Sequence, residues 1–458
     1  MSKVHFIGIK GVGMSALAII AKQRGWQVTG SDRSDKYITD KTLQQAGIRV
    51  ADFDVANIKA DLDLVVIGGA WPQDHPEYLA AEKQKIKIKT YSEFLGELMS
   101  TKLGVAISGS HGKTTTTAII ARILKEARRD PSYLIGTGTV DGLDGNAHAG
   151  KGKVFVVEAD EYRAAAWRPI SKFLDLDYQI AVLTGIEFDH PDFFKDITDI
   201  EHAFKKYIEK LPEDKGILIA AGDDLRVKKL LEDLPHGIRV ETYGDSTDND
   251  WNYELIKQTK TGSQFTINHK GKNIGTFKLW LPGEYNIANA LAAIAVARNL
   301  KVGWPIIKKV LKSFQGAQRR FDVSKSGRRI FIDDYAHHPT AIKAFLKAVK
   351  VRYPKYKIWA VFQPHTASRT NSLLGEFAEA FNDADKVLIA DIFASARGDK
   401  TDIGSKDLAE AIAEHHPDVM YSGSLIDTKK FLKKDLPDKV VLATIGAGDV
   451  YEILEELK

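Results

Sequence analysis

The sequence predicts an α/β protein of three domains, each built around a parallel β-sheet. Its 458 residues exceed the length that one hydrophobic core usually supports. Short apolar runs alternate with segments of helical period, which is typical of parallel strands joined by helices. Because these runs fall into three sets, with breaks near residues 101 and 317, we expect domains at 1–101, 102–316 and 317–458.

The composition excludes several classes of protein. Lys and Arg number 65 against 61 Asp and Glu, so the net charge of +4 gives no reason to expect a nucleic-acid partner. There is no cysteine, which excludes disulfides and thiolate metal sites. No apolar run approaches the roughly 18 to 20 residues of a membrane span, and no signal-peptide pattern precedes the first strand. We therefore expect a cytoplasmic protein without membrane insertion.

The first set of apolar runs contains a glycine-rich turn. Its segments read VHFIGI, MSALAIIAKQRG, WQVTGSD, DLDLVVIGGA and IKIKTYSEFLGELM. Gly8, Gly11 and Gly13 follow the opening strand, where backbone N–H groups at a helix start can bind a phosphate. Asp32 ends the next strand, at a place where an acid can bind ribose hydroxyls. The spacing G-x-x-G-x-G is not the dinucleotide pattern, so a diphosphate-containing nucleotide fits better than NAD; the alternative is glycines that serve close strand–helix packing.

The second and third sets repeat the strand-then-helix order. The second reads LGVAIS, VFVVEAD, IAVLTGIEFDH and GILIAAGDD, and the third reads RIFIDDYAHHP, IWAVFQPH, KVLIADIF and KVVLATIGAGD. Between them, residues 247–280 alternate polar and apolar side chains with turn signals. This alternation predicts an antiparallel edge within the middle domain.

A second glycine-rich turn, VAISGSHGKTTTTAII, lies at residues 105–120. Ile107 occupies the position where the usual pattern G-x-x-x-x-G-K-[ST] has its first glycine, so the loop is shorter. Lys113 stands where it can reach β and γ phosphates, and the Thr114 hydroxyl where it can bind Mg²⁺. Four threonines are poor helix formers, so propensity does not explain them. The alternative is a structural strand-to-helix turn.

Acidic clusters end two strands of the middle set. VFVVEADEY supplies Glu158, Asp160 and Glu161, and IAVLTGIEFDHPD supplies Glu187, Asp189, His190 and Asp192. Because the carboxyl ends of parallel strands meet at one edge of a sheet, we expect both clusters to face the phosphate loop. Carboxylates are ligands that Mg²⁺ prefers, so one ion on the nucleotide and a second near His190 are expected.

An ordered series of motifs resembles the Mur ligases over nearly the whole chain. The motifs are GIKGVGMS, GSHGKTTTT, EADEY, EFDHPD, GEYNIANALAA, QRRFD, DDYAHHP, VFQPHTASRT and GAGD. The resemblance implies an N-terminal Rossmann-like UDP-sugar domain, a central P-loop ATPase-like domain and a C-terminal Rossmann-like amino-acid domain. It also implies a monomeric or homodimeric ligase of peptidoglycan precursor synthesis, with ATP and Mg²⁺ as cofactors. ATP would phosphorylate the lactyl carboxylate of UDP-N-acetylmuramate, and an amine would attack the acyl phosphate.

The same resemblance assigns roles to residues of this sequence. Those implied as catalytic are Lys113, Glu158, His190 and Arg320. Those implied to bind ATP are Gly109, Ser110, His111, Gly112, Lys113, Thr114, Thr115, Asn286, Asn289, Arg320 and Asp334. Those implied to bind the UDP-sugar are Gly8, Gly11, Gly13, Met14, Ser15 and Asp32. Tyr335, His365 and Arg369 would bind the incoming amino acid, and Thr114, Glu158 and His190 would bind metal.

Four positions depart from the family pattern, and the sequence leaves two possible acceptors. Tyr285 stands where His is common, Gly185 where Asn is common, and Gly68-Gly69 where serines are usual. The long segment from Glu158 to His190, with its RPISKF stretch, resembles members that attach a recycled L-alanyl-γ-D-glutamyl-meso-diaminopimelate tripeptide. The C-terminal motifs VFQPHTASRT and GAGD favour L-alanine as the acceptor amine, which is our expectation.

Two functions of other classes remain as alternatives. Rossmann-like domains at both ends suggest a nicotinamide oxidoreductase, although G-x-G-x-x-G is missing and Lys113-Thr114 is present. The phosphate loop alone also suits a non-catalytic nucleotide switch.

Overall fold

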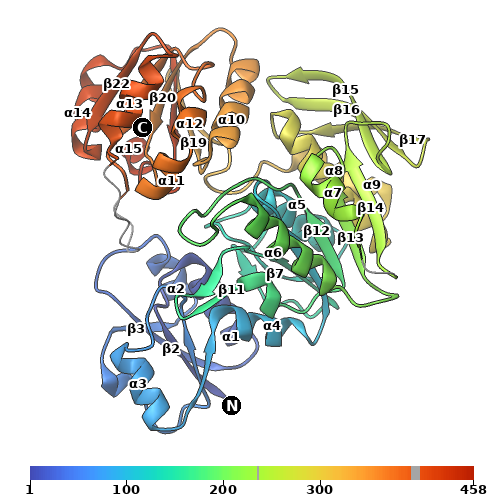
Figure 1. Cartoon of the computed structure of the whole chain (residues 1–458), viewed down its shortest axis with the longest axis vertical. Coiled ribbons are helices and arrows are strands. Elements are labelled where there is room, and N and C mark those ends of the chain that lie inside the picture. The colour runs from blue at the N-terminus through green and yellow to red at the C-terminus, as the bar shows by residue number, and fades with distance from the viewer. Residues whose placement is uncertain (235–236, 394–402, 458) are drawn as a thin grey trace.

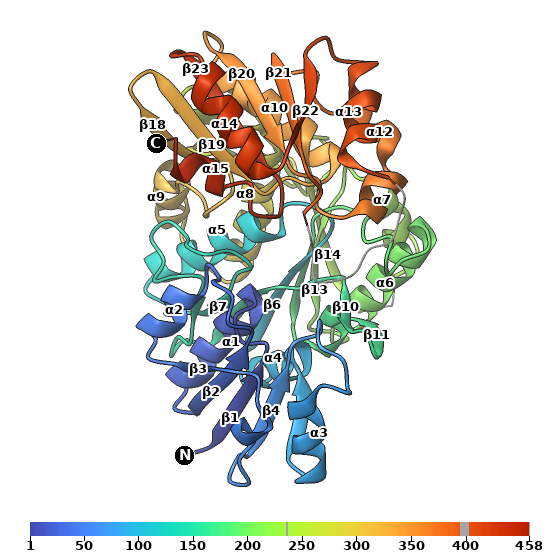
Figure 2. The same cartoon turned by 90° about the vertical axis from the view of Figure 1, so that its left-hand side faces the viewer.

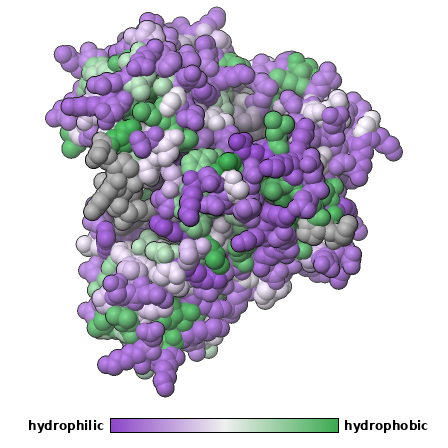
Figure 3. Space-filling model, in the orientation of Figure 1, coloured by the Kyte–Doolittle hydropathy of each residue, from purple (hydrophilic) through white to green (hydrophobic). Residues whose placement is uncertain are grey.

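The computed structural model describes residues 1–234, 237–393 and 403–457. It contains three α/β units, each with its own sheet. Figure 2 shows them one above another, the N-terminal unit at the bottom and the C-terminal unit at the top. In the part of the chain described, no helix is long and apolar enough to cross a membrane. The face drawn in Figure 3 is mostly hydrophilic, with separate apolar patches.

The N-terminal unit is a parallel sheet of five strands in the order β3-β2-β1-β4-β5. The strands are β1 (Lys3–Ile7), β2 (Gln27–Asp32), β3 (Arg49–Asp52), β4 (Leu64–Ile67) and β5 (Lys87–Thr90). The helices are α1 (Val12–Gln23), α2 (Asp40–Gln45), α3 (Pro76–Lys83) and α4 (Tyr91–Met99), with a short 3₁₀ turn η1 (Val55–Asn57). Strand–helix alternation follows the apolar runs, because strands buried on both faces need continuous apolar sequence.

The middle unit is a sheet of ten strands in the order β17-β16-β15-β14-β13-β12-β6-β9-β7-β8. Its strands are β6 (Leu103–Ser108), β7 (Ser132–Leu134), β8 (Ala147–His148), β9 (Val154–Glu158), β12 (Ile180–Leu183), β13 (Ile217–Ala221), β14 (Arg239–Gly244), β15 (Trp251–Thr259), β16 (Gly262–His269) and β17 (Lys272–Leu279). Strands β15, β16 and β17 pair antiparallel, which confirms the edge expected at residues 247–280.

Five helices and one hairpin complete the middle unit. The helices are α5 (Lys113–Glu126), α6 (Ile197–Glu209), α7 (Leu225–Leu231), α8 (Glu284–Asn299) and α9 (Trp304–Ser313). The hairpin of β10 (Arg163–Ala165) and β11 (Arg168–Ser171) precedes the 3₁₀ turn η2 (Lys172–Asp175) and forms a separate two-stranded sheet. The central helices α5 and α8 pack on each other.

The C-terminal unit is a sheet of six strands in the order β18-β19-β23-β20-β21-β22. Its strands are β18 (Asp322–Ser326), β19 (Arg329–Asp334), β20 (Lys357–Phe362), β21 (Lys386–Ala390), β22 (Val419–Gly423) and β23 (Val440–Ile445). Its helices are α10 (Pro339–Arg352), α11 (Ala367–Ser372), α12 (Leu374–Ala378), α13 (Ser405–Ala413), α14 (Leu425–Asp435) and α15 (Glu452–Glu455). All strand pairs are parallel except β18–β19.

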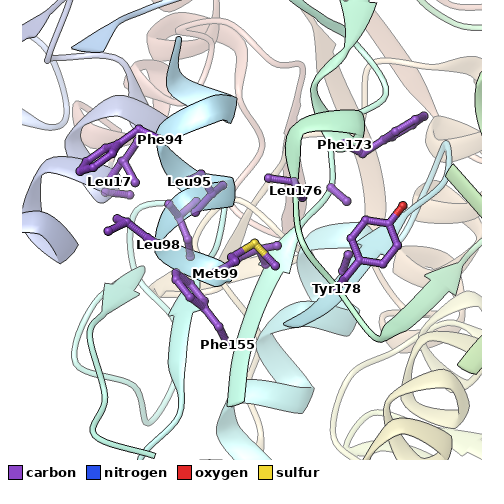
Figure 4. Close-up of a cluster of buried hydrophobic side chains, with 14 of the residues drawn as sticks. Leu17, Phe94, Leu95, Leu98, Met99, Phe155, Phe173, Leu176 and Tyr178 are labelled. Carbon is purple, nitrogen blue, oxygen red and sulfur yellow. The ribbon is translucent and has the colours of Figure 1, made fainter. Parts of the chain in front are cut away.

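The hydrophobic cores divide the molecule unevenly. One core joins the N-terminal and middle units, and Figure 4 shows members from both sides of their junction: Leu17, Phe94, Leu95, Leu98 and Met99 belong to the first unit, and Phe155, Phe173, Leu176 and Tyr178 to the second. The C-terminal unit has cores of its own, against which two side chains of the middle unit, Phe188 and Tyr285, pack. The first two units therefore share a core, whereas the third contacts them mainly through side chains at its edge.

Candidate active site between the middle and C-terminal domains

The phosphate loop connects β6 to α5 and depends on two glycines. Gly109 and Gly112 have φ values of +123° and +84°, which side chains with a Cβ rarely adopt. A Cβ on Gly112 would also lie 2.1 Å from Oδ1 of Asn289 on α8. Ile107 is buried within β6, so the shorter loop begins only after the strand has ended. Backbone N–H groups at the start of α5 are thus available to an anion.

Lys113, the first residue of α5, is paired with Glu161. Its Nζ donates to both carboxylate oxygens of Glu161 at 2.9 Å and to the backbone oxygen of Gly109. Burial alone lowers the pKa of Lys113, but the charges of Glu161 and Asp160 outweigh this and raise it. The ammonium is therefore fully charged at the mouth of the phosphate loop.

Thr114 lies between an acid of its own domain and an arginine of the next. Its hydroxyl donates to Glu158 Oε2 at 3.0 Å, and Nη2 of Arg320 donates to the same hydroxyl at 2.9 Å. Glu158 also accepts from the backbone N–H of Gly136 at 2.6 Å. Burial raises the pKa of Glu158, and Arg320 opposes this rise. The structure thus brings Arg320 from the C-terminal domain to the phosphate loop.

A second group of possible metal ligands lies beside Lys113. Ligand atoms of Asp160, Glu161 and His190 all lie within 4.8 Å of one another, and Nε2 of His190 is 3.7 Å from Glu161. The carboxylates of Asp160 and Glu161, and the hydroxyl of Thr114 with the carboxylate of Glu158, supply the oxygen atoms that Mg²⁺ prefers as ligands. His190 is therefore grouped with Glu161, whereas Thr114 is grouped with Glu158, so the residues expected to bind metal fall into two groups.

The residues expected around the adenosine lie at one side of the loop. Asn286 and Asn289 are buried on α8 and joined by a hydrogen bond of 3.3 Å. Asp334, at the end of β19, accepts from the backbone N–H groups of Phe321 and Ala336 at 2.8 and 2.9 Å. Burial raises the pKa of Asp334 to about 6. Tyr285, which stands where His is common, is half-buried against the C-terminal core, and burial raises its pKa.

The remaining loop residues are held by the backbone and by acids nearby. The backbone N–H of Ser110 donates to the carbonyl of Gly185, and its hydroxyl donates to the carbonyl of Glu187. His111 lies 3.1 Å from Glu187. Thr115 is buried on α5. With Gly at 185, the loop is bound through main-chain atoms rather than through an asparagine side chain.

The three residues expected to bind an amino acid lie at the edge of the C-terminal domain that faces the middle domain. Arg369, on α11, donates to Asp189 Oδ1 at 2.8 Å through Nε and at 2.6 Å through Nη2, and both side chains are nearly buried. His365 lies 3.4 Å from Arg369. The ring of Tyr335 lies 4.8 Å from the guanidinium carbon of Arg320. Asp189 therefore already holds the guanidinium that was expected to face the amino-acid carboxylate.

The residues expected to bind a UDP-sugar gather at the end of β1, in the N-terminal domain. Gly8 has a φ of +77°, and a Cβ there would lie 2.0 Å from Nε1 of Trp71. Asp32 is buried and accepts from the backbone N–H groups of Lys10 and Arg33 at 2.7 and 2.8 Å, so it organises the turn itself. Gly11, Gly13, Met14 and Ser15 belong to the cap and first turns of α1.

The glycine pair at 68–69 has a local explanation in the β10–β11 hairpin. A Cβ on Gly69 would lie 2.2 Å from the backbone oxygen of Ala164, whereas one on Gly68 would lie at an ordinary 3.5 Å from Trp71. The hairpin carries the RPISKF stretch and so packs directly on the N-terminal domain. A serine at position 69 would collide with it.

Several residues of this site were not singled out from the sequence. Glu161, Glu187 and Asp189 were noted only as acids at strand ends, and their partners Lys113, His111 and Arg369 were not paired with them. Position at the end of an apolar strand was the signal for all three acids. The partner of Asp189 lies 180 residues further along the chain, so no local pattern reveals it.

The fold and the site together define a three-domain α/β enzyme with a phosphate-binding loop between β6 and α5. Family models match the chain in three consecutive parts: the Mur ligase family, catalytic domain (residues 3–103), the Mur ligase middle domain (107–297) and the Mur ligase, glutamate ligase domain (319–448). The chain belongs to the Mur ligase family.

Individual relatives cover the chain almost completely. A UDP-N-acetylmuramate–L-alanine ligase of Levilactobacillus brevis is 42% identical, covering 97% of this chain and 94% of the relative. One of Desulfitobacterium hafniense is 39% identical, covering 99% of both. Among solved structures, the UDP-N-acetylmuramate-alanine ligase of Thermotoga maritima has a TM-score of 0.83 at 26% identity, covering 100% of this chain and 98% of that one. A murein peptide ligase of Psychrobacter arcticus has a TM-score of 0.75 at 26% identity, with the same coverage.

Proposed function

We propose that this protein joins L-alanine to the lactyl carboxylate of UDP-N-acetylmuramate, using ATP and releasing ADP and phosphate. The observation that carries the proposal is the meeting of Lys113, Thr114 and Glu158 with Arg320, which reaches them from another domain. Relatives about 40% identical over nearly the whole chain bear the name of this ligase. The reaction belongs to the cytoplasmic stage of peptidoglycan precursor synthesis.

The reaction would proceed in two steps. The γ-phosphoryl group passes from ATP to the sugar carboxylate, forming an acyl phosphate and ADP. The amine nitrogen of alanine then attacks the acyl carbon, loses a proton and expels phosphate, leaving an amide. Lys113 and Arg320 would offset the charge that develops on the phosphoryl oxygens. Thr114 with Glu158, and His190 with its acids, would hold Mg²⁺, which would supply positive charge beside the phosphates.

The acceptor would be bound at the edge of the C-terminal domain that carries Tyr335, His365 and Arg369. Nη1 of Arg369 does not bind Asp189 and carries two hydrogens, of which the 3.4 Å contact with Nδ1 of His365 uses at most one, so it can still face an amino-acid carboxylate. The β10–β11 hairpin, which suggested the tripeptide, lies against Gly69 of the N-terminal domain. This placement supports alanine, because the hairpin contacts the sugar domain rather than the acceptor residues.

The test is a coupled assay for ADP with ATP, Mg²⁺ and UDP-N-acetylmuramate, run once with L-alanine and once with the tripeptide. We expect ADP release that depends on both the UDP-sugar and alanine, with a new amide product by mass spectrometry. Faster turnover with the tripeptide would assign the recycling activity instead. ATP turnover without any UDP-sugar would indicate a nucleotide switch, and NADH binding without ATP binding an oxidoreductase.

A further inference from the structure

A third cluster of ligating side chains joins the middle and C-terminal domains. Nε2 of His111, from the phosphate loop, lies 3.1 Å from Oε2 of Glu187. Nδ1 of His338, at the start of α10, lies 3.2 Å from the same oxygen. All three ligand atoms lie within 4.8 Å of one another, and the two imidazole rings are 5.0 Å apart. This cluster shares no residue with the Thr114–Glu158 pair or with the group around His190.

The hydrogen bonds of this cluster leave no hydrogen between His338 and Glu187. Nε2 of His338 lies 3.2 Å from the backbone oxygen of Phe188, and a carbonyl only accepts, so Nε2 carries the hydrogen. In the neutral ring, Nδ1 then presents a lone pair toward a carboxylate oxygen of Glu187. The backbone N–H of Thr340 also reaches Nδ1, at a long 3.4 Å. Two acceptors thus face each other at hydrogen-bond distance.

Burial keeps the histidine neutral and leaves the acid ionised. His338 is 6% exposed, and burial together with the charge of His111 lowers its pKa. Burial alone raises the pKa of Glu187, but His111 and His338 lower it overall to about 2. At neutral pH a cation between the three ligand atoms would satisfy both acceptors.

We propose that His111, Glu187 and His338 form a binding site for a first-row transition metal ion such as Zn²⁺. Two imidazoles and one carboxylate match the ligand set of zinc sites that keep a fourth position open. Imidazole ligands favour zinc over Mg²⁺, which prefers oxygen. The hydrogen bond from His338 to a backbone carbonyl is the outer contact that fixes the tautomer of a metal-binding histidine.

The bound ion would join two domains that otherwise meet through few apolar contacts. His111 and Glu187 belong to the middle domain, whereas His338 caps the first helix of the C-terminal domain that faces it. Phe188, next to Glu187, packs on the C-terminal core. The ion would therefore hold the C-terminal domain closed over the phosphate loop.

The experiment uses the full chain, freed of metals and without nucleotide or Mg²⁺, titrated with Co²⁺ and with Zn²⁺ against a chromophoric chelator. We expect one equivalent of Co²⁺ with the intense visible bands of a four-coordinate site, displaced by Zn²⁺. His338→Asn, which keeps a capping side chain, should weaken binding at least about 100-fold. Glu187→Gln should weaken it similarly.

The controls separate this site from other histidines. His148→Asn removes a histidine that pairs with Asp130 at 2.9 Å but has no third ligand among the described residues, and this variant should bind Co²⁺ as the parent protein does. His190→Asn should likewise keep the Co²⁺ spectrum. Unchanged affinity in His338→Asn, loss of the spectrum in His190→Asn only, or the absence of tight binding to the parent would each overturn the proposal. Circular dichroism confirms that each variant is folded.

Discussion

Lys113 and Glu161 form a nearly buried ion pair whose members depend on each other. Their side chains are 18% and 5% exposed, and both carboxylate oxygens contact the ammonium. Removing one member of such a pair leaves an uncompensated charge, which costs more than the pair contributes. The position of Lys113 in the loop was predictable from the sequence, because G-K-T after a strand is a local pattern. Its partner was not, because Glu161 is one of several acids after β9.

Lys113→Met is expected to abolish ADP formation and to lower the free energy of unfolding by about 3–5 kcal/mol, because Glu161 is left charged and buried. The double variant Lys113→Met/Glu161→Gln should regain most of that stability and no activity. Urea unfolding and the ADP assay measure the two effects separately. Equal stability of the single and double variants would contradict the claim that Glu161 depends on Lys113 for compensation of its charge.

The pKa of Asp334 predicts a pH dependence of ATP affinity. The family resemblance implies that Asp334 binds the ribose of ATP. A carboxylate must be ionised to accept hydrogen bonds from both ribose hydroxyls, and the pKa of about 6 means that this form is lost as pH falls through 6. ATP affinity should therefore decrease about tenfold per pH unit below that value. Calorimetry from pH 5 to 8 measures the ATP affinity of the parent protein and of Asp334→Asn. The variant serves as the reference, because the titration of ATP itself affects both proteins equally. Parallel profiles of ATP affinity against pH in the two proteins would exclude the assignment of Asp334 to the ribose.

At the scale of elements, the parallel strands and main helices followed from apolar periodicity, whereas the short pieces did not. The β10–β11 hairpin spans only Arg163–Ser171 and contains charged residues and a proline, so no period marks it. Its position is set by tertiary contacts. The ion pairs of Arg168 with Asp175 and of Lys172 with Asp160 hold it to the middle domain, and Ala164 approaches Gly69 of the N-terminal domain.

The two adjacent glycines provide a matched test of that contact. Gly69→Ala should destabilise the protein by about 1–3 kcal/mol, because its Cβ would lie 2.2 Å from a backbone oxygen that cannot rotate away. Gly68→Ala should be close to neutral, since its nearest neighbour is at 3.5 Å. Thermal unfolding of both variants measures the difference. Similar midpoints would show that the hairpin adapts freely.

At the scale of the whole molecule, the buried pair of Asp189 and Arg369 joins two domains. Arg369→Met leaves Asp189, 6% exposed, without its guanidinium, so docking of the C-terminal domain should weaken by about 3–5 kcal/mol. Small-angle X-ray scattering should show a larger radius of gyration, and Asp189→Asn/Arg369→Met should reverse it. An unchanged radius in the single variant would mean that other contacts suffice for docking.

Such contacts between domains explain where prediction from the sequence ends. Arg320 was expected to bind the nucleotide, and the structure places it within hydrogen-bond distance of Thr114. Arg369 was expected to bind the amino acid, and the structure pairs it with Asp189. The pairings themselves depend on how rigid bodies meet, a property that no local pattern contains. The same holds for His338, whose neighbour His111 lies over 200 residues earlier in the chain.

The core shared by the N-terminal and middle domains has a consequence for how this chain can be divided. Leu95 and Met99 would be left facing water in a fragment that ends at residue 101, so we expect that fragment to aggregate. A fragment of residues 317–458 keeps its own cores. The C-terminal third is thus the interchangeable module of the protein, which a recombination event can replace while the first two thirds remain intact.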